Sequence, residues 1–192
     1  KSKKLKLVPC FHEQACAIAA EAYYKTSGKV GVVLVTAGPG LSNISTGVLS
    51  AYVDRIPMII LSGQAQSKYL KHSSLRIFGP QAVSAEKLFG NISKVLEINS
   101  QTKVNQINKF IKFQDYADFG PKIIQVPLDL QRMHINNSSK NIYNFVSIKK
   151  RTKDKDKLFK TLEKLIKESK RPSVLIGGGL RNDEGKEILK DF

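Results

Sequence analysis

Apolar residues in the first 130 positions follow two alternating patterns. Four short stretches, 30–35, 58–61, 93–98 and 122–126, are rich in apolar residues. The most continuous of them are typical of parallel strands that are covered on both faces. Between them, residues 12–26, 42–54 and 103–117 place apolar residues at helical spacing. Strands that alternate with helices predict an α/β domain with a parallel sheet. We expect one further short strand at residues 5–9.

The first predicted helix, residues 12–26, is rich in small side chains, and Gly28 follows it as a stop signal. Small residues allow a helix to lie close to its neighbour, so we expect this helix to be buried. Residues 64–80 are polar and are expected to form a loop.

The pattern changes after residue 130. Residues 131–153 are rich in Asn, Ser and Lys, with weak periodicity, and we interpret them as a linker between a first domain, 1–130, and a second, 154–192. In the second, Leu158, Leu162, Leu165 and Ile166 share one helical face. A strand at 173–176, the triple glycine 177–179 and a helix from about Asp183 follow. These elements cannot close a core, so we expect the chain to stop inside a Rossmann-like α/β domain.

The net charge of +16 raises the question of a nucleic-acid partner. The densest basic cluster lies at residues 149–157, at the expected linker and helix start, and no aromatic residues alternate with it as a single-strand platform requires. The pattern favours a solvated basic surface over nucleic-acid binding. Part of this charge could steer anionic ligands.

The remaining composition favours a cytoplasmic protein with no membrane span. No apolar run approaches the roughly 20 residues that a membrane-spanning helix needs. The basic residues 1–6 have no apolar stretch after them, so they do not form a signal peptide. Cys10 and Cys16 are too few for a disulfide framework, and their spacing is not that of metal ligands.

Two features carry candidate chemistry. The turn Thr36-Ala37-Gly38-Pro39-Gly40 joins a strand to a helix, where free N–H groups can bind an anion. It is neither a dinucleotide fingerprint nor a P-loop, so by itself it fits a plain turn as well as a phosphate cradle.

Glu13, at the start of the first helix, is either a helix-capping acid or a general acid. Because small apolar residues follow it, we expect partial burial to raise the pKa of Glu13, as general acid catalysis at neutral pH requires.

Taken together, these residues resemble the pyrimidine-binding domain of thiamine diphosphate enzymes, and most of all that of acetolactate synthase and its relatives. The resemblance begins at His12-Glu13-Gln14 and continues through Gly28-Lys29, residues 30–43, Thr46-Gly47, Ala51-Tyr52, Asp54, Ile56-Pro57-Met58 and Ser62-Gly63. Three further patches agree: Leu75-Arg76, Gly79 and Gln81 leading to Ile92-Ser93-Lys94, residues 120–129, and residues 171–179.

The resemblance implies a role for particular residues. Glu13 matches the glutamate that hydrogen-bonds the aminopyrimidine ring and promotes cofactor activation. The other matches of this domain hold the pyrimidine ring: Thr36, Gly38, Pro39 and Asn43. Gln81 matches a glutamine that faces the reacting centre, although an ordinary loop amide is the alternative. No residue of this chain is assigned to a metal.

The resemblance also implies an activity: decarboxylation of a 2-oxoacid such as pyruvate, with carboligation to 2-acetolactate in branched-chain amino acid biosynthesis. The alternatives are a related enzyme of sugar or polysaccharide biosynthesis, another 2-oxoacid decarboxylase, and a silent binding or regulatory module with the same fold. Ala82 stands where the family usually has Glu, and residues 85–90 depart from its Val/Ile-rich stretch, so the substrate preference stays open.

The cofactor and assembly expectations have the same basis. We expect thiamine diphosphate, with Mg²⁺ held by a diphosphate-binding domain that this chain lacks, as it lacks the family's first strand and helix. The family also allows FAD. A homodimer or homotetramer is expected, with the active site at the subunit interface, so these 192 residues alone are expected to show no turnover.

Overall fold

A computed structural model describes residues 6–70, 79–114, 116–133 and 155–177, together with residues 187 and 190. The chain divides into two compact units, residues 1–149 and residues 150–192, and each is described by itself. Within the described residues, no helix is long and apolar enough to cross a membrane.

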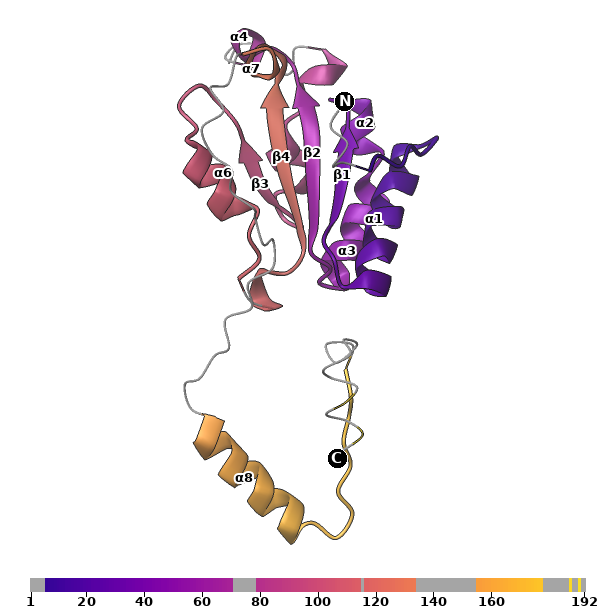
Figure 1. Ribbon diagram of the computed structural model, residues 1–192, viewed down its shortest axis with the longest axis vertical. Coiled ribbons are helices and arrows are strands. Elements are labelled where there is room, and N and C mark those ends of the chain that lie inside the picture. Colours follow the sequence, from indigo (N-terminus) through magenta and orange to yellow (C-terminus); the bar gives the residue numbers. More distant parts are fainter. Residues whose placement is uncertain are drawn as a thin grey trace. The chain divides into compact units, whose positions relative to one another are not determined.

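The first unit is built on a four-stranded parallel sheet with the order β1-β2-β4-β3 (Figure 1). Its strands are β1 (Gly31–Val35), β2 (Met58–Gln64), β3 (Lys94–Glu97) and β4 (Pro121–Pro127). The α/β class with a parallel sheet is therefore confirmed, and all four strands predicted between residues 30 and 126 are present.

Seven α-helices are described in this unit: α1 (Glu13–Ser27), α2 (Pro39–Ser42), α3 (Ser45–Val53), α4 (Ser67–Leu70), α5 (Ala85–Phe89), α6 (Val104–Phe110) and α7 (Leu128–Gln131). Two short 3-10 helices are added, η1 (Pro80–Ala82) and η2 (Tyr116–Asp118). Gly28 ends α1 in the left-handed conformation with φ 67°, as predicted.

The core lies between one face of the sheet and helices α1, α3 and α5. In the strand register, Val33, Ile60, Ile123 and Val95 are neighbours across the sheet, and all four belong to this core or pack against it. The opposite face of the sheet meets α6 and the segment after it, because Lys122 of β4 lies against the rings of Phe110 and Phe113. The helices on both faces form the expected three-layer arrangement. The expectation that the run at 30–35 is covered on both faces was wrong, because Val32 and Leu34 of β1 are exposed.

Helix α1 is buried on one face only, so the prediction of a buried helix was too broad. Ala17 and Ala20 are buried, whereas Ala15, Ile18, Ala19 and Ala22 are exposed. The buried face approaches α3 closely: a Cβ added at Gly47 would lie 2.5 Å from the Cβ of Ala17. The small residues therefore serve this one helix contact rather than full enclosure.

Several element predictions were wrong in detail. Residues 6–9 and 172–177 form no strand, because neither segment has a neighbouring strand among the described residues to pair with. The helix expected at 42–54 is present as α3, which begins at Ser45, whereas α2 was not predicted because it lies mostly in the expected turn. The helix expected at 103–117 ends at Phe110. The polar segment after β2 contains α4, and α5 was not predicted.

The C-terminus of α3 ends in a left-handed backbone conformation, which glycine usually adopts. Arg55 has φ 51°, and the N–H of Ile56 donates to the carbonyl of Ala51 at 2.8 Å. This is a Schellman-type ending with arginine at the left-handed position. A side chain in this conformation costs about 1 kcal/mol relative to glycine.

In the second unit, α8 (Lys155–Glu168) confirms the helix predicted near residue 154. Leu162, Leu165 and Ile166 of its apolar face are exposed. Gly178, Gly179, the helix start expected near Asp183 and most of the expected linker lie outside the described residues. The domain boundaries at 130 and 154 remain predictions.

Candidate functional site

The candidate site lies at the carboxyl edge of the sheet, beyond the end of β1. The chain leaves the strand at Val35 and enters α2 at Pro39, and Gly38 between them has φ 64° and ψ −113°. A Cβ added at Gly38 would lie 2.1 Å from the carbonyl oxygen of Pro80. No residue except glycine fits here, because a side chain would meet backbone of another segment.

Glu13 reaches this turn from the start of α1. His12 caps the helix, with its Nδ1 accepting from the N–H of Gln14 at 3.1 Å. The Asn43 side-chain amide, at the C-terminus of α2, donates from Nδ2 to Oε2 of Glu13 at 3.1 Å. The close contact of α1 with α3 brings these two residues together although they are 30 positions apart in the sequence.

Thr36 and Gly40 complete the arrangement around the carboxylate. A Cβ added at Gly40 would lie 2.3 Å from Oγ1 of Thr36 and 3.3 Å from Oε1 of Glu13. The hydroxyl and the carboxylate therefore lie so close to Gly40 that a side chain at this position would collide with the hydroxyl, and only glycine allows this packing. Thr36, Pro39 and Asn43 are exposed, so the polar groups of the turn are accessible to a ligand.

The expected direction of the Glu13 pKa was wrong for this chain. The Asn43 amide, followed by the backbone N–H of Glu13 itself, holds the pKa of Glu13 below its usual range and outweighs desolvation, which acts in the opposite direction. The carboxylate lies at the exposed helix end rather than against the apolar face of α1. Glu13 is therefore ionised at neutral pH in the chain described here.

Gln81 lies next to the same turn through its backbone. A Cβ added at Gly38 would lie 2.9 Å from the Cα of Gln81, and the Gln81 side chain is exposed. The structure thus groups Glu13, Thr36 and Asn43 around Gly40 and places Gln81 beside Gly38. Leu75 and Arg76, which the resemblance included, lie outside the described residues.

Residues that sequence reasoning missed hold the segment of Gln81 in place. Gln125, buried in β4, accepts from the N–H of Ala85 at 2.9 Å and donates to the carbonyl of Val83 at 2.9 Å. Gln64 at the end of β2 donates to the same carbonyl at 3.0 Å. The signal was a polar residue inside an otherwise apolar strand, since buried amides are almost always hydrogen-bonded.

Comparison with known proteins gives the class of this domain. Residues 1–85 match the family model described as "Thiamine pyrophosphate enzyme, N-terminal TPP binding domain". Residues 1–85 are therefore similar to the N-terminal TPP-binding domain of thiamine pyrophosphate enzymes, as the resemblance indicated.

The individual relatives narrow the type within this class. The chain is 34% identical over 185 residues to a probable acetolactate synthase large subunit of Methanococcus aeolicus, covering 93% of this chain and 30% of the relative. It is 31% identical over 192 residues to the acetolactate synthase large subunit of Lactococcus lactis, covering 94% and 31%. The match is thus to the acetolactate synthase type, and the chain spans about a third of the length of these relatives.

The grouped residues fit the pyrimidine half of thiamine diphosphate. Glu13 offers a carboxylate, Asn43 an amide and Thr36 a hydroxyl, and Gly40, which has no side chain, allows the carboxylate and the hydroxyl to lie close together. These are hydrogen-bonding groups suited to a nitrogen-rich ring. In the part of the chain that the structure describes, no group of three or more His, Cys, Asp or Glu side chains is placed to hold a metal ion.

Proposed function

We propose that this chain provides the pyrimidine-binding part of a thiamine diphosphate-dependent carboligase that decarboxylates pyruvate and forms 2-acetolactate. The observation that carries the proposal is the hydrogen bond from Asn43 to Glu13 beside the Gly38-Pro39-Gly40 turn. It joins two residues that the family resemblance assigns to one ring, from distant parts of the sequence.

The proposed roles follow from the chemistry of each side chain. Glu13 binds a ring nitrogen through its carboxyl group and exchanges a proton there. Asn43 orients that carboxyl group through its amide, and Thr36, Gly38 and Pro39 shape the wall of the ring pocket. When bound, thiamine diphosphate supplies the electron sink that decarboxylation of a 2-oxoacid needs. Gln81 faces the substrate side.

Binding of the ring also bears on the protonation of Glu13. In the chain alone the carboxylate is accessible to water, and its pKa is lowered. A ring that covers Glu13 and excludes water would raise the pKa of this carboxyl group, because desolvation disfavours the charged form. The proton-donating state that general acid catalysis needs is thus proposed to form on cofactor binding.

The remaining features of the proposal concern the whole protein. Mg²⁺ would be held outside the residues described here, together with the diphosphate, and FAD is the second cofactor that the resemblance allows. We propose a homodimer or homotetramer with the active site at the subunit interface. The proposed place of action is the cytoplasm, in branched-chain amino acid biosynthesis.

The direct experiment incubates the intact protein with pyruvate and measures CO₂ release and 2-acetolactate together. Both should appear only when thiamine diphosphate and Mg²⁺ are present. CO₂ with an aldehyde product would favour a simple decarboxylase. Cofactor binding without turnover of any 2-oxoacid would favour the silent module with the same fold.

A further inference from the structure

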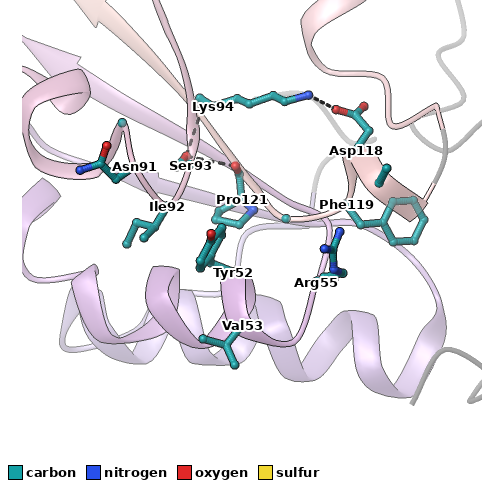
Figure 2. Close-up of a pocket in the computed structure, with 13 residues that line it drawn as sticks. Tyr52, Val53, Arg55, Asn91, Ile92, Ser93, Lys94, Asp118, Phe119 and Pro121 are labelled. Atoms are coloured by element: carbon teal, nitrogen blue, oxygen red, sulfur yellow. Dashed lines mark hydrogen bonds and ion pairs between the residues drawn. The ribbon is translucent and has the colours of Figure 1, made fainter. Parts of the chain in front are cut away.

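A cavity of about 510 Å³ lies at the opposite edge of the sheet from the Gly38 turn (Figure 2). It is lined by the end of α3, by residues 90–94 and by residues 117–121. Lys94 begins β3 and Pro121 begins β4, so the cavity lies where these strands begin. The candidate cofactor site lies beyond the carboxyl end of β1, and the two are separate.

The charge of the cavity lining is positive. Lys94 forms an ion pair with Asp118, and Lys122, buried behind the lining, donates to the same carboxylate at 2.7 Å. Asp118 is therefore neutralised by its own lysines. Arg55 takes part in none of the ion pairs formed among the described residues, so its guanidinium leaves a net positive charge facing the cavity.

The backbone of Arg55 is a second, independent observation. With φ 51° it is the one non-glycine residue of the described chain that has positive φ. Glycine or asparagine would fit this helix ending with less strain. Strained conformations that persist are frequent at functional sites. The side chain at this strained position is a guanidinium, which binds carboxylate and phosphate groups through paired N–H donors.

The rest of the lining suits the uncharged part of a small organic molecule. Figure 2 shows Tyr52 and Arg55 extending from the end of α3 toward the strand start at Pro121, whereas the ring of Phe119 extends away from Tyr52. The Phe119 ring packs edge to face against Tyr24 and Phe113. Asn91 adds an amide from the other wall. Ligand sites of this kind combine apolar and aromatic walls with a few polar groups that fix orientation.

The walls of the cavity are held in place by hydrogen bonds. Ser93 donates from Oγ to the carbonyl of Pro121 at 3.0 Å, which ties the start of β3 to the start of β4. The N–H groups of Ile92 and Ser93 donate to the carbonyl of Phe89 at 2.9 and 2.8 Å. The cavity is therefore formed before any ligand arrives, and binding would not have to order its walls.

We propose that this cavity binds a small organic anion, whose phosphate or carboxylate group is held by Arg55 and whose ring portion lies against Tyr52. Such a site is additional to the cofactor site and takes a different ligand. A phosphate and a carboxylate share the oxyanion chemistry that the guanidinium recognises, and the experiment separates them.

The test measures binding to the intact protein by isothermal titration calorimetry with three probes: adenosine 5′-monophosphate, benzoate and inorganic phosphate. If adenosine 5′-monophosphate binds and benzoate does not, the cavity is a phosphate site. If benzoate binds and adenosine 5′-monophosphate does not, the cavity is a carboxylate site. Inorganic phosphate should bind more weakly than adenosine 5′-monophosphate, because it makes no contact with the aromatic wall.

The decisive variants are Arg55→Asn and Arg55→Gly, which remove the guanidinium at a position where both new residues suit the backbone. We expect the Kd of the binding probe to rise at least about tenfold, since a charge-assisted pair is lost. The melting temperature should stay the same or increase, which separates lost binding from lost folding.

Two controls locate the effect. Arg132→Gln removes the same charge after α7, away from the cavity, and should change Kd less than about twofold. Glu13→Gln should leave probe binding unchanged, so failure of the proposed enzyme activity and failure of this site are distinguishable. The proposal is overturned if no probe binds below about 10 mM, or if the Arg55 variants bind as tightly as the parent.

Discussion

The side-chain amide of Asn43 donates to the carboxylate of Glu13 at 3.1 Å, which links the end of α2 to the start of α1. This bond is the first cause of the lowered pKa of Glu13. It fixes the carboxyl group at the edge of the Gly38-Pro39-Gly40 turn.

Removing the side-chain amide of Asn43 should raise the pKa of Glu13. In Asn43→Ala we expect this pKa to rise toward its ordinary value, because the carboxylate loses its strongest hydrogen bond. Titration of the carboxyl carbon of Glu13 by NMR measures the change, and Asn91→Ala serves as a control outside the candidate cofactor site. An unchanged pKa in Asn43→Ala would show that the bond does not hold the carboxylate.

The same hydrogen bond predicts how the stability of the fold changes with pH. Because the folded-state pKa of Glu13 is lowered, the contribution of Glu13 to stability is fully present at pH values above its unfolded-state pKa. It is lost as pH falls through the lower, folded-state value. Asn43→Ala should therefore reduce the acid sensitivity of unfolding over that window.

Gly38 and Gly28 form a matched pair for testing the turn. Both have positive φ, but a Cβ at Gly28 meets nothing within 4 Å, whereas one at Gly38 would lie 2.1 Å from the carbonyl oxygen of Pro80. We expect Gly28→Ala to cost about 1 kcal/mol from backbone strain alone. Gly38→Ala should cost about 3 kcal/mol, since backbone must move as well. Urea unfolding measures both, and equal losses would disprove the close contact.

The buried pair Lys122–Asp118 should be a main electrostatic support of the sheet face opposite α1. Burial lowers the pKa of Lys122, and for Asp118 the two lysines outweigh desolvation, so its pKa is lowered as well. Asp118→Asn leaves Lys122 buried without its carboxylate partner and should destabilise the unit by about 3 kcal/mol.

The exposed pair Lys25–Asp54 provides the comparison for this loss. Asp54→Asn should cost less than about 1 kcal/mol, because water already screens the pair.

The contribution of Asp118 to stability should be present at pH values above the unfolded-state carboxyl pKa and should disappear as pH falls through its lower folded-state value. Equal losses in the two variants, measured by urea unfolding, would contradict the role given to burial.

The thiol of Cys16 should be slow to react. Desolvation raises its pKa, and the side chain of Cys10 and the charge of Glu13 raise it further. Since the thiolate is the nucleophile, alkylation of Cys16 at neutral pH should be slower in the folded protein than in guanidinium chloride. Peptide mass spectrometry after iodoacetamide treatment measures the rates. Equal rates in the two states would rule out the raised pKa.

Much of this architecture could be predicted because its elements carry their own signals. The apolar runs predicted β1, β2 and β4, and Gly28 marked the end of α1. The expectation that such runs are covered on both faces holds for β2 and β4 but was wrong for β1, where Val32 and Leu34 are exposed. Segments whose structure depends on a neighbouring strand were predicted wrongly. Residues 173–176 have the composition of a strand, but a strand forms only where a neighbour accepts its hydrogen bonds.

The sequence predicted which residues belong to the candidate site, but it did not predict the direction of the Glu13 pKa. The spacing of Glu13, Thr36 and Asn43 identified the residues through a family resemblance. The direction of the Glu13 pKa depended on the position of one amide, which no sequence pattern gives. The role of Gln125 was hidden for the same reason, because its partners belong to a distant loop.

The most direct test of the central claim compares Glu13→Gln with Glu86→Gln in the intact protein. Glu86 is an exposed acid in α5, so its variant controls for the loss of one carboxylate. Glu13→Gln should lower kcat/KM for pyruvate at least about 100-fold while thiamine diphosphate still binds, and Glu86→Gln should keep full turnover. Turnover of Glu13→Gln within twofold of the parent would contradict the assignment of Glu13 to the cofactor ring.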